Sequence, residues 1–269
     1  MTAQDEGPAL ARYQKRSRRA KPGIMATVTL VLGELLITAG VLICAFVAWQ
    51  TWYYDPSISR EQSSVADEYV QQWQQEASSD AATDDTSGTE DATVSAEDAP
   101  VAETPAEEGE VWGVMYVPRF GSDWKKPVAW GTDMATVLNT LGIGTYEQSV
   151  MPGAVGNTIV AAHRSGQGSG FYDIHKLRLG DEIIIETEEG WYTYAYRNTE
   201  YIVDTDVQLL SPVPMKPEET ATGKILSLQS CNPLPVSNEE RIIAYAVLES
   251  FTPREAGAPQ VVQDMGGGD

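Results

Sequence analysis

The chain has 269 residues, a formal net charge of −21 and two cysteines. This acidic balance, with no basic face evident beyond the first 21 residues, argues against nucleic-acid binding. Two cysteines exclude a disulfide framework. Because Cys44 lies in a long apolar run and Cys231 in the C-terminal half, the sequence predicts that Cys231 is a free thiol.

The first 54 residues have the composition of a membrane anchor. Residues 1–23 form a basic tail, and residues 24–54 form an apolar run that exceeds the roughly 20 residues a spanning helix needs. The run ends in Trp and Tyr side chains typical of a membrane interface. The positive-inside rule predicts a single-pass signal anchor in the cell membrane, with a cytoplasmic N-terminus and an extracellular remainder. Glu34 lies inside the run, where a functional role and a tolerated irregularity are both open.

Residues 55–110 are predicted to form a disordered acidic tether. From residue 57 onward this segment holds one cation, Arg60, against 15 Asp and Glu, and almost no large apolar side chain follows Trp73. Such a segment cannot bury enough apolar surface to fold alone. Only residues 60–76 are predicted as a short helix that continues from the membrane. Residues 252–269 are predicted to be a disordered tail.

Residues 111–251 are predicted to fold as a mostly β domain. Short apolar runs rich in β-branched and aromatic residues alternate with Gly, Pro, Asn and Asp clusters, which is typical of a barrel or sandwich. A hairpin turn is predicted at residues 188–190 and one or two helical turns at residues 134–141. The predicted strands cover residues 114–117, 158–162, 182–187, 191–196, 201–203, 225–228 and 242–248.

Cys231 and Arg241 are candidates for acyl-transfer chemistry. Cys231 ends an apolar strand, because the Asn-Pro pair after it cannot continue a ladder, and Arg241 begins the next apolar run. On neighbouring strands the thiol and the guanidinium can face one small volume. Taken singly, each is a weak signal: Cys231 also fits an inert buried thiol, and Arg241 a strand-edge arginine paired with Glu239 or Glu240.

A thiol needs a nearby base or cation to become a nucleophile. His163 ends an apolar strand and opens into the Gly-rich stretch 165–170, which suits an accessible site. His175 lies in an amphipathic stretch that suits packing or the surface. The sequence therefore favours His163 as the partner of Cys231.

The order of His, then Cys at a strand end, then Arg after a loop resembles the sortase transpeptidases. Ser230 stands where the family usually has Thr, and Ala162 where Gly is more usual. The PRFG opening, the WYTY strand and LSPVP at 210–214 look most like class E sortases of actinobacteria. The matching segments are YVPRFG at 116–121, PGAVGNTIVAAHR at 152–164, LRLGDEIIIET at 177–187, LSLQSC at 226–231 and ERII at 240–243.

This resemblance implies a closed eight-stranded β-barrel with short helices and a site in a groove at one end. It implies that Cys231 attacks the Thr–Gly bond in a C-terminal sorting signal of a secreted protein, of LAxTG or LPxTG type. The thioacyl intermediate would pass to an amine of a peptidoglycan precursor or a pilin. His163 would be the general acid and base, Arg241 the stabiliser of substrate and oxyanion, and Ser230 a substrate-binding hydroxyl. No cofactor or metal ligand is implied, and a metal requirement stays open.

Other classes fit less well. An L,D-transpeptidase places His-Gly directly before its cysteine, where Gln229 and Ser230 stand here. A papain-like hydrolase needs the cysteine before the histidine, on a helix. Two alternatives stay open: a pilin-polymerising sortase, and a non-catalytic membrane-tethered β domain that binds a partner and keeps Cys231 as a structural thiol.

Overall fold

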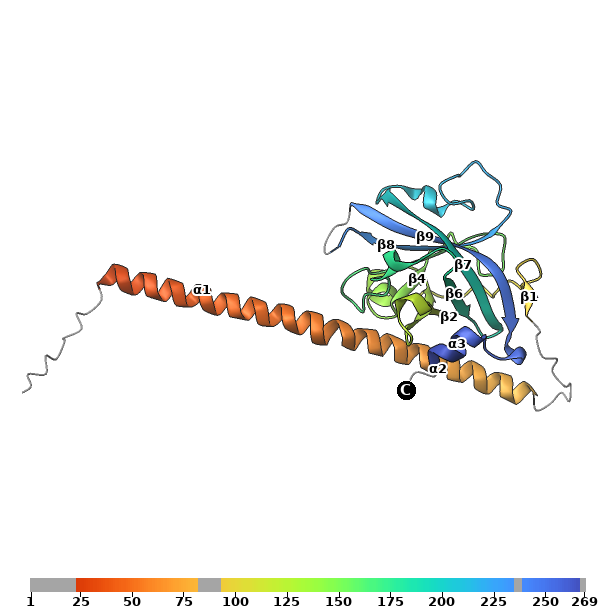
Figure 1. Cartoon of the computed structure of the whole chain (residues 1–269), viewed down its shortest axis with the longest axis horizontal. Coiled ribbons are helices and arrows are strands. Elements are labelled where there is room, and N and C mark those ends of the chain that lie inside the picture. Colours follow the sequence, from red (N-terminus) through yellow and green to blue (C-terminus); the bar gives the residue numbers. More distant parts are fainter. Residues whose placement is uncertain (1–22, 82–92, 235–238, 267–269) are drawn as a thin grey trace, which may run out of the picture. The chain divides into compact units, whose positions relative to one another are not determined.

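The computed structural model describes residues 23–81, 93–234 and 239–266, which fall into two units (Figure 1). The first unit contains most of helix α1 (Ile24–Trp49), and none of the described side chains of this helix is buried. Among the described residues, one helix is long and apolar enough to cross a membrane, and α1 is its apolar part. This helix is compatible with the single-pass anchor predicted at residues 24–54. The predicted basic tail falls almost entirely outside the described residues.

Eight strands of the second unit close into a barrel (Figure 1). They run in the order β9-β7-β6-β2-β3-β4-β5-β8, and β8 pairs with β9 to complete the ring, while β1 adds to β9 from outside. The β3–β4 and β5–β8 pairs are parallel and the other pairs are antiparallel. The predicted closed barrel is confirmed. The strands are β1 Val94–Ser95, β2 Val111–Tyr116, β3 Lys125–Trp130, β4 Ile143–Thr145, β5 Gly156–Ala162, β6 Glu182–Glu186, β7 Gly190–Val203, β8 Lys224–Asn232 and β9 Glu240–Pro253.

The barrel is apolar on its inside and, in places, on its outside. In β6, Ile183 and Ile185 belong to the main core, whereas Ile184 packs in a second cluster with Trp191 and helices that cover the barrel. A third cluster, which includes Ile159, lies under the connection between β7 and β8. Because both faces of such strands are covered, they read as continuous apolar runs instead of alternating ones.

Helix α2 (Asp55–Ala81) occupies the first half of the predicted tether, so the short helix predicted at residues 60–76 is confirmed and the prediction of disorder around it is wrong. Its barrel-facing side chains recur every three or four residues, which is the spacing of one helix face. Alone, this segment lacks apolar surface, but the barrel supplies the partner against which Ala66 and Trp73 are buried. The side chains that contact the barrel include Ser59, Gln62, Ser63, Ala66, Asp67, Tyr69, Val70 and Trp73.

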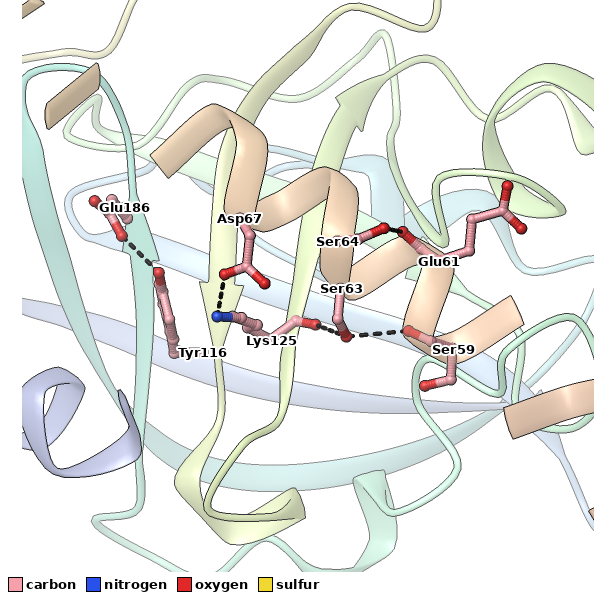
Figure 2. A network of polar contacts seen from close by, with 8 residues as sticks. All are labelled: Ser59, Glu61, Ser63, Ser64, Asp67, Tyr116, Lys125 and Glu186. Carbon is pink, nitrogen blue, oxygen red and sulfur yellow. Dashed lines mark hydrogen bonds and ion pairs between the residues drawn. The ribbon is translucent and has the colours of Figure 1, made fainter. Parts of the chain in front are cut away.

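Polar contacts between α2 and β3 explain why β3 was not predicted. Its sequence begins Lys-Lys-Pro, which disfavours a strand. In the structure Lys126 is buried, and its Nζ donates to the carbonyl (2.9 Å) and hydroxyl (2.7 Å) of Ser59 and to Oε1 of Gln62 (3.0 Å). Burial lowers the pKa of Lys126 to about 8. Figure 2 shows the neighbouring contacts, in which Ser63 donates to the Lys125 carbonyl and Asp67 pairs with the Lys125 ammonium.

The described remainder of the predicted tether and tail is also packed on the barrel. Val94–Ser95 pairs with β9, and Ala99 and Ala102 are buried in the main core. Residues 82–92 lie outside the described residues. In the predicted disordered tail, helix α3 (Gln260–Gly266) packs in the same cluster as Trp73 of α2. Both predictions of disorder failed because they judged these segments without the barrel surface beside them.

An arginine anchors this covered side of the barrel. The Arg254 guanidinium lies 4.8 Å from the Trp191 ring centroid and 5.7 Å from that of Trp73. It also forms a buried ion pair with Glu186 at 2.9 Å. The same carboxylate accepts a 2.7 Å hydrogen bond from the Tyr116 hydroxyl (Figure 2). The charge of Arg254 is therefore matched by a carboxylate and two aromatic faces, one of which belongs to α2.

Docking of α2 predicts that Trp73 contributes to the stability of the whole domain. Trp73→Ala should lower the free energy of unfolding by about 3 kcal/mol, the usual cost of emptying an aromatic site in a core. Gln74→Ala, on the exposed side of the same helix, should change it by less than about 0.5 kcal/mol. Denaturant titration of both variants measures the difference, and equal stabilities would contradict the docking of α2.

Candidate active site

Strand register brings the three predicted catalytic residues to the same end of the barrel. Strand β8 lies between β5 and β9. On one side Cys231 is paired directly with Arg241 of β9. On the other, the parallel ladder with β5 reaches the Ala161–Gln229 pair, and the same register puts His163, the residue after β5, level with Cys231.

The outer face of the barrel carries this site. Side chains alternate along a strand, so Cys231 faces the same side of β8 as Ile225, which packs in the outer cluster with Ile159 and Ile243. Arg241 stands two residues before Ile243 on β9 and shares its side. Cys231 is a free, half-buried thiol. The thiol and the guanidinium therefore lie side by side where the outer cluster ends.

Ser230 secures this register. Its buried hydroxyl donates a 2.8 Å hydrogen bond to the carbonyl of Ala162, the residue immediately before His163. The bond joins the main chain next to the histidine to the side chain next to the cysteine. Ser230 thus has a structural use besides the substrate contact that the family resemblance implies.

Asn139 orients the imidazole of His163. The His163 Nε2 atom lies 2.8 Å from Oδ1 of Asn139. An amide oxygen only accepts, so this contact requires a proton on Nε2, and the neutral ring keeps its free lone pair on Nδ1. Burial lowers the pKa of His163, which favours the neutral ring at pH 7. The imidazole is therefore prepared to accept a proton through Nδ1.

Arg164 adds a second guanidinium beside the cysteine. It is buried, and its Nη1 donates to the carbonyl of Cys231 at 3.2 Å and to Oδ1 of Asn232. Since Arg164 follows His163 in the chain, it ties the histidine segment to the end of β8. Its donors are directed at the backbone of Cys231, which is a positioning contact.

Tyr146 and Arg241 complete the surroundings of the thiol. The Tyr146 hydroxyl donates to Oε1 of Gln229 at 3.1 Å. Burial raises the pKa of Tyr146, while the charge of Arg241 opposes the shift. Arg241 is half-buried, and its Nη1 donates to the main-chain oxygen of Glu240 at 3.0 Å. The guanidinium is thus held by the main chain of its own strand.

Sequence reasoning missed Asn139, Arg164 and Tyr146. Asn139 follows the short helix Met134–Leu138, which confirms the predicted helical turns but carries no motif. Tyr146 follows β4, which was not predicted. Arg164 adjoins His163 in a matching segment, so its position was visible although its partner was not. The other histidine, His175, is exposed, in keeping with its predicted surface or packing role.

A metal site has no obvious ligand set in the ranges that the structure describes, where no three His, Cys, Asp or Glu side chains gather closely enough to hold an ion. The functional groups of this site are a thiol, an imidazole and guanidinium groups. Together they suit acyl transfer through a covalent intermediate.

The family model for the sortase domain matches residues 115–249, which contain the whole site. The chain therefore belongs to the sortase family, whose members are cysteine transpeptidases. It is 31% identical over 235 residues to sortase SrtE2 of Streptomyces coelicolor, covering 85% of each chain. It is 27% identical over 258 residues to sortase SrtE1 of the same organism, covering 94% of this chain but only 65% of that relative.

Solved structures give the same assignment. Sortase E of Streptomyces avermitilis superposes with a TM-score of 0.52 at 37% identity, covering 58% of this chain and 99% of that one. SrtA of Actinomyces oris superposes with a TM-score of 0.58 at 29% identity, covering 63% of this chain and 96% of that one. The resemblance to class E sortases is confirmed.

The protonation state inferred for His163 can be measured by NMR titration of its imidazole. The chain has two histidines, so the His175→Gln variant leaves one signal and assigns it. The midpoint should lie below 6.5, because burial disfavours the charged ring. A midpoint above 6.5 would contradict the lowering of the His163 pKa by burial, on which the inferred neutral resting state depends.

Proposed function

We propose that the chain is a membrane-anchored sortase that cleaves a sorting signal of secreted proteins between Thr and Gly and joins the new acyl group to an amine. The observation that carries this proposal is the register of three adjacent strands, with Cys231 paired to Arg241 and level with His163. A peptide substrate agrees with a relative, since sortase E1 of Streptomyces coelicolor was solved with a tripeptide in its active site.

The first half-reaction acylates the enzyme. Nδ1 of His163 takes the proton of the Cys231 thiol, and the thiolate attacks the Thr carbonyl carbon. Negative charge moves to the carbonyl oxygen, where the planar donors of Arg241 stabilise it. The C–N bond then breaks, and the His163 imidazolium returns its proton to the leaving Gly amine, which leaves a thioester on Cys231.

The second half-reaction releases the product. An incoming amine attacks the thioester carbonyl, gives its proton to His163, and displaces the Cys231 thiolate. The thioester conserves the energy of the cleaved peptide bond, so the transfer needs no nucleotide, which suits a site outside the membrane. A peptidoglycan precursor is the proposed acceptor, and an LAxTG-like signal is the proposed donor because the chain resembles class E members.

The basic segment before α1 supports the proposed orientation. By the positive-inside rule it keeps the N-terminus in the cytoplasm and puts the barrel outside the cell. Proteins that have just been exported then meet the barrel at the membrane surface, where lipid-linked cell-wall precursors also lie.

The thioacyl intermediate gives a direct test of the proposed chemistry. The full chain in detergent micelles, mixed with an LAxTG peptide and hydroxylamine, should yield the peptide hydroxamate ending at Thr. In a parallel mixture without hydroxylamine, which cleaves thioesters, digestion should locate an acyl adduct on Cys231. Cys231→Ala should abolish both products, and Cys44→Ala should leave both unchanged. A folded wild-type chain that forms neither adduct nor hydroxamate with any Thr–Gly peptide would favour the binding-domain alternative.

Arg241→Lys tests the need for planar donors at the oxyanion. Lys keeps the charge but presents it from a flexible point, so kcat/KM should fall by roughly 10²-fold, near the loss seen when an oxyanion donor is removed. Arg197→Lys is the matched control, because Arg197 forms an exposed ion pair with Glu249 at 2.9 Å. Equal activity of the Arg241→Lys variant and the wild type would remove Arg241 from the mechanism.

A further inference from the structure

Gln62 of α2 reaches the chain segment that follows His163. This glutamine is fully buried. Its Nε2 donates to the main-chain oxygen of Gln167 at 3.2 Å, and its Oε1 accepts from Nζ of Lys126 at 3.0 Å. A carbonyl on one side and an ammonium on the other fix the orientation of the amide. A neutral carboxamide offers both a donor and an acceptor, which matches these two partners.

The same side chain fills the space between two segments that flank the histidine. Gly168, with φ +81°, comes so close that a Cβ there would lie 2.4 Å from Oε1 of Gln62. Gly142, with φ +100°, would place a Cβ 3.0 Å from the same amide. Gly168 belongs to the segment after His163, and Gly142 to the segment after Asn139. Gln62 therefore contacts both the segment that carries the imidazole and the segment that orients it.

Gln167 is bound to α2 through its main-chain carbonyl, which accepts the hydrogen bond from Gln62. The residue adopts φ 49°, a left-handed conformation that a glutamine rarely takes without support. The segment closes back on the histidine, because the N–H of Phe171 donates to the His163 carbonyl at 2.9 Å. Residues 163–171 thus form a loop that is closed at the His163 main chain and bound to α2 at Gln167.

We infer that Gln62 is a positioning residue for His163, and that α2, the helix that follows the membrane anchor, forms part of the active-site framework. The inference rests on the proposed function in one respect, namely that His163 is the base. Gln62 touches neither the thiol nor the imidazole. It acts by holding the segment after His163 and the segment after Asn139 in place, and these segments position the imidazole. Loss of Gln62 should therefore slow the chemical step more than it weakens substrate binding.

Two variants isolate the contact with Gln167. Gln62→Glu keeps an acceptor for Lys126 but places an oxygen against the Gln167 carbonyl. Gln62→Met has similar length without charge, and leaves Lys126 its two bonds to Ser59 at 2.9 and 2.7 Å. Both variants lose the donor to Gln167, and they differ in charge and in the contact with Lys126. Gln71→Glu makes the same chemical change on the exposed side of α2 and serves as the matched control.

The experiment measures peptide transfer kinetics and the imidazole NMR signal of His163 in the full chain. Both Gln62 variants should shift the His163 signal and lower kcat by roughly tenfold to a hundredfold, with KM within about twofold, because a displacement near 1 Å has such an effect on an aligned reaction. Gln71→Glu should match the wild type in both measurements. A His163 signal and kcat that stay at wild-type values in both Gln62 variants overturn the inference, as does a change seen in only one of them.

Failure of the proposed function gives a different pattern. If the wild-type chain transfers no peptide, the kinetic comparison is lost along with the proposed function, but the His163 signal still reports the contact. A shifted signal in both Gln62 variants then supports the positioning role, and an unshifted signal rejects it. A loss of thermal stability with an unshifted signal also rejects it, since Gln62 would then only fill space.

Discussion

The register of β8 between its two neighbours is the constraint on which the candidate site depends. Side chains alternate along a strand, so a slip of one residue would turn Cys231 to the opposite face and Leu228 out of the core. Pairing on both edges prevents such a slip, and the Ser230 hydroxyl adds a bond across the β5–β8 edge. The hydrophobic core therefore determines where the thiol points.

Polar contacts between barrel and helix extend this framework to α2. A buried ammonium at Lys126 needs acceptors, and the helix supplies them from Ser59 and Gln62. On the same side of the barrel, Arg254 binds Glu186 and the faces of two tryptophans. These groups make the docked position specific, because an alternative position would leave charges buried without partners. The segment between α1 and the barrel is accordingly a structural element for at least the length of α2.

The sequence predicted the parts of the site that local patterns encode. Cys231 at a strand end and Arg241 at a strand start were visible from apolar runs and an Asn-Pro pair, and His163 from its position before a Gly-rich stretch. The closed barrel followed only from the resemblance to sortases, because the parallel β5–β8 pairing joins segments separated by a long connection. The helix predicted at residues 60–76 lies within α2, but its docking on the barrel was missed since its contact stripe is largely polar, and β3 was missed since its sequence begins Lys-Lys-Pro. In both cases the missing information was the partner surface, which composition does not carry.

The most direct measurement is a crystal structure of the protein trapped by a peptide that carries a thiol-reactive group in place of the Thr–Gly bond. The account predicts a covalent bond to Sγ of Cys231, the peptide oxygen within hydrogen-bond distance of the Arg241 guanidinium, and the His163 imidazole beside the sulfur. A trapped peptide whose oxygen is held by other donors, with Arg241 still turned to the Glu240 carbonyl, would contradict it.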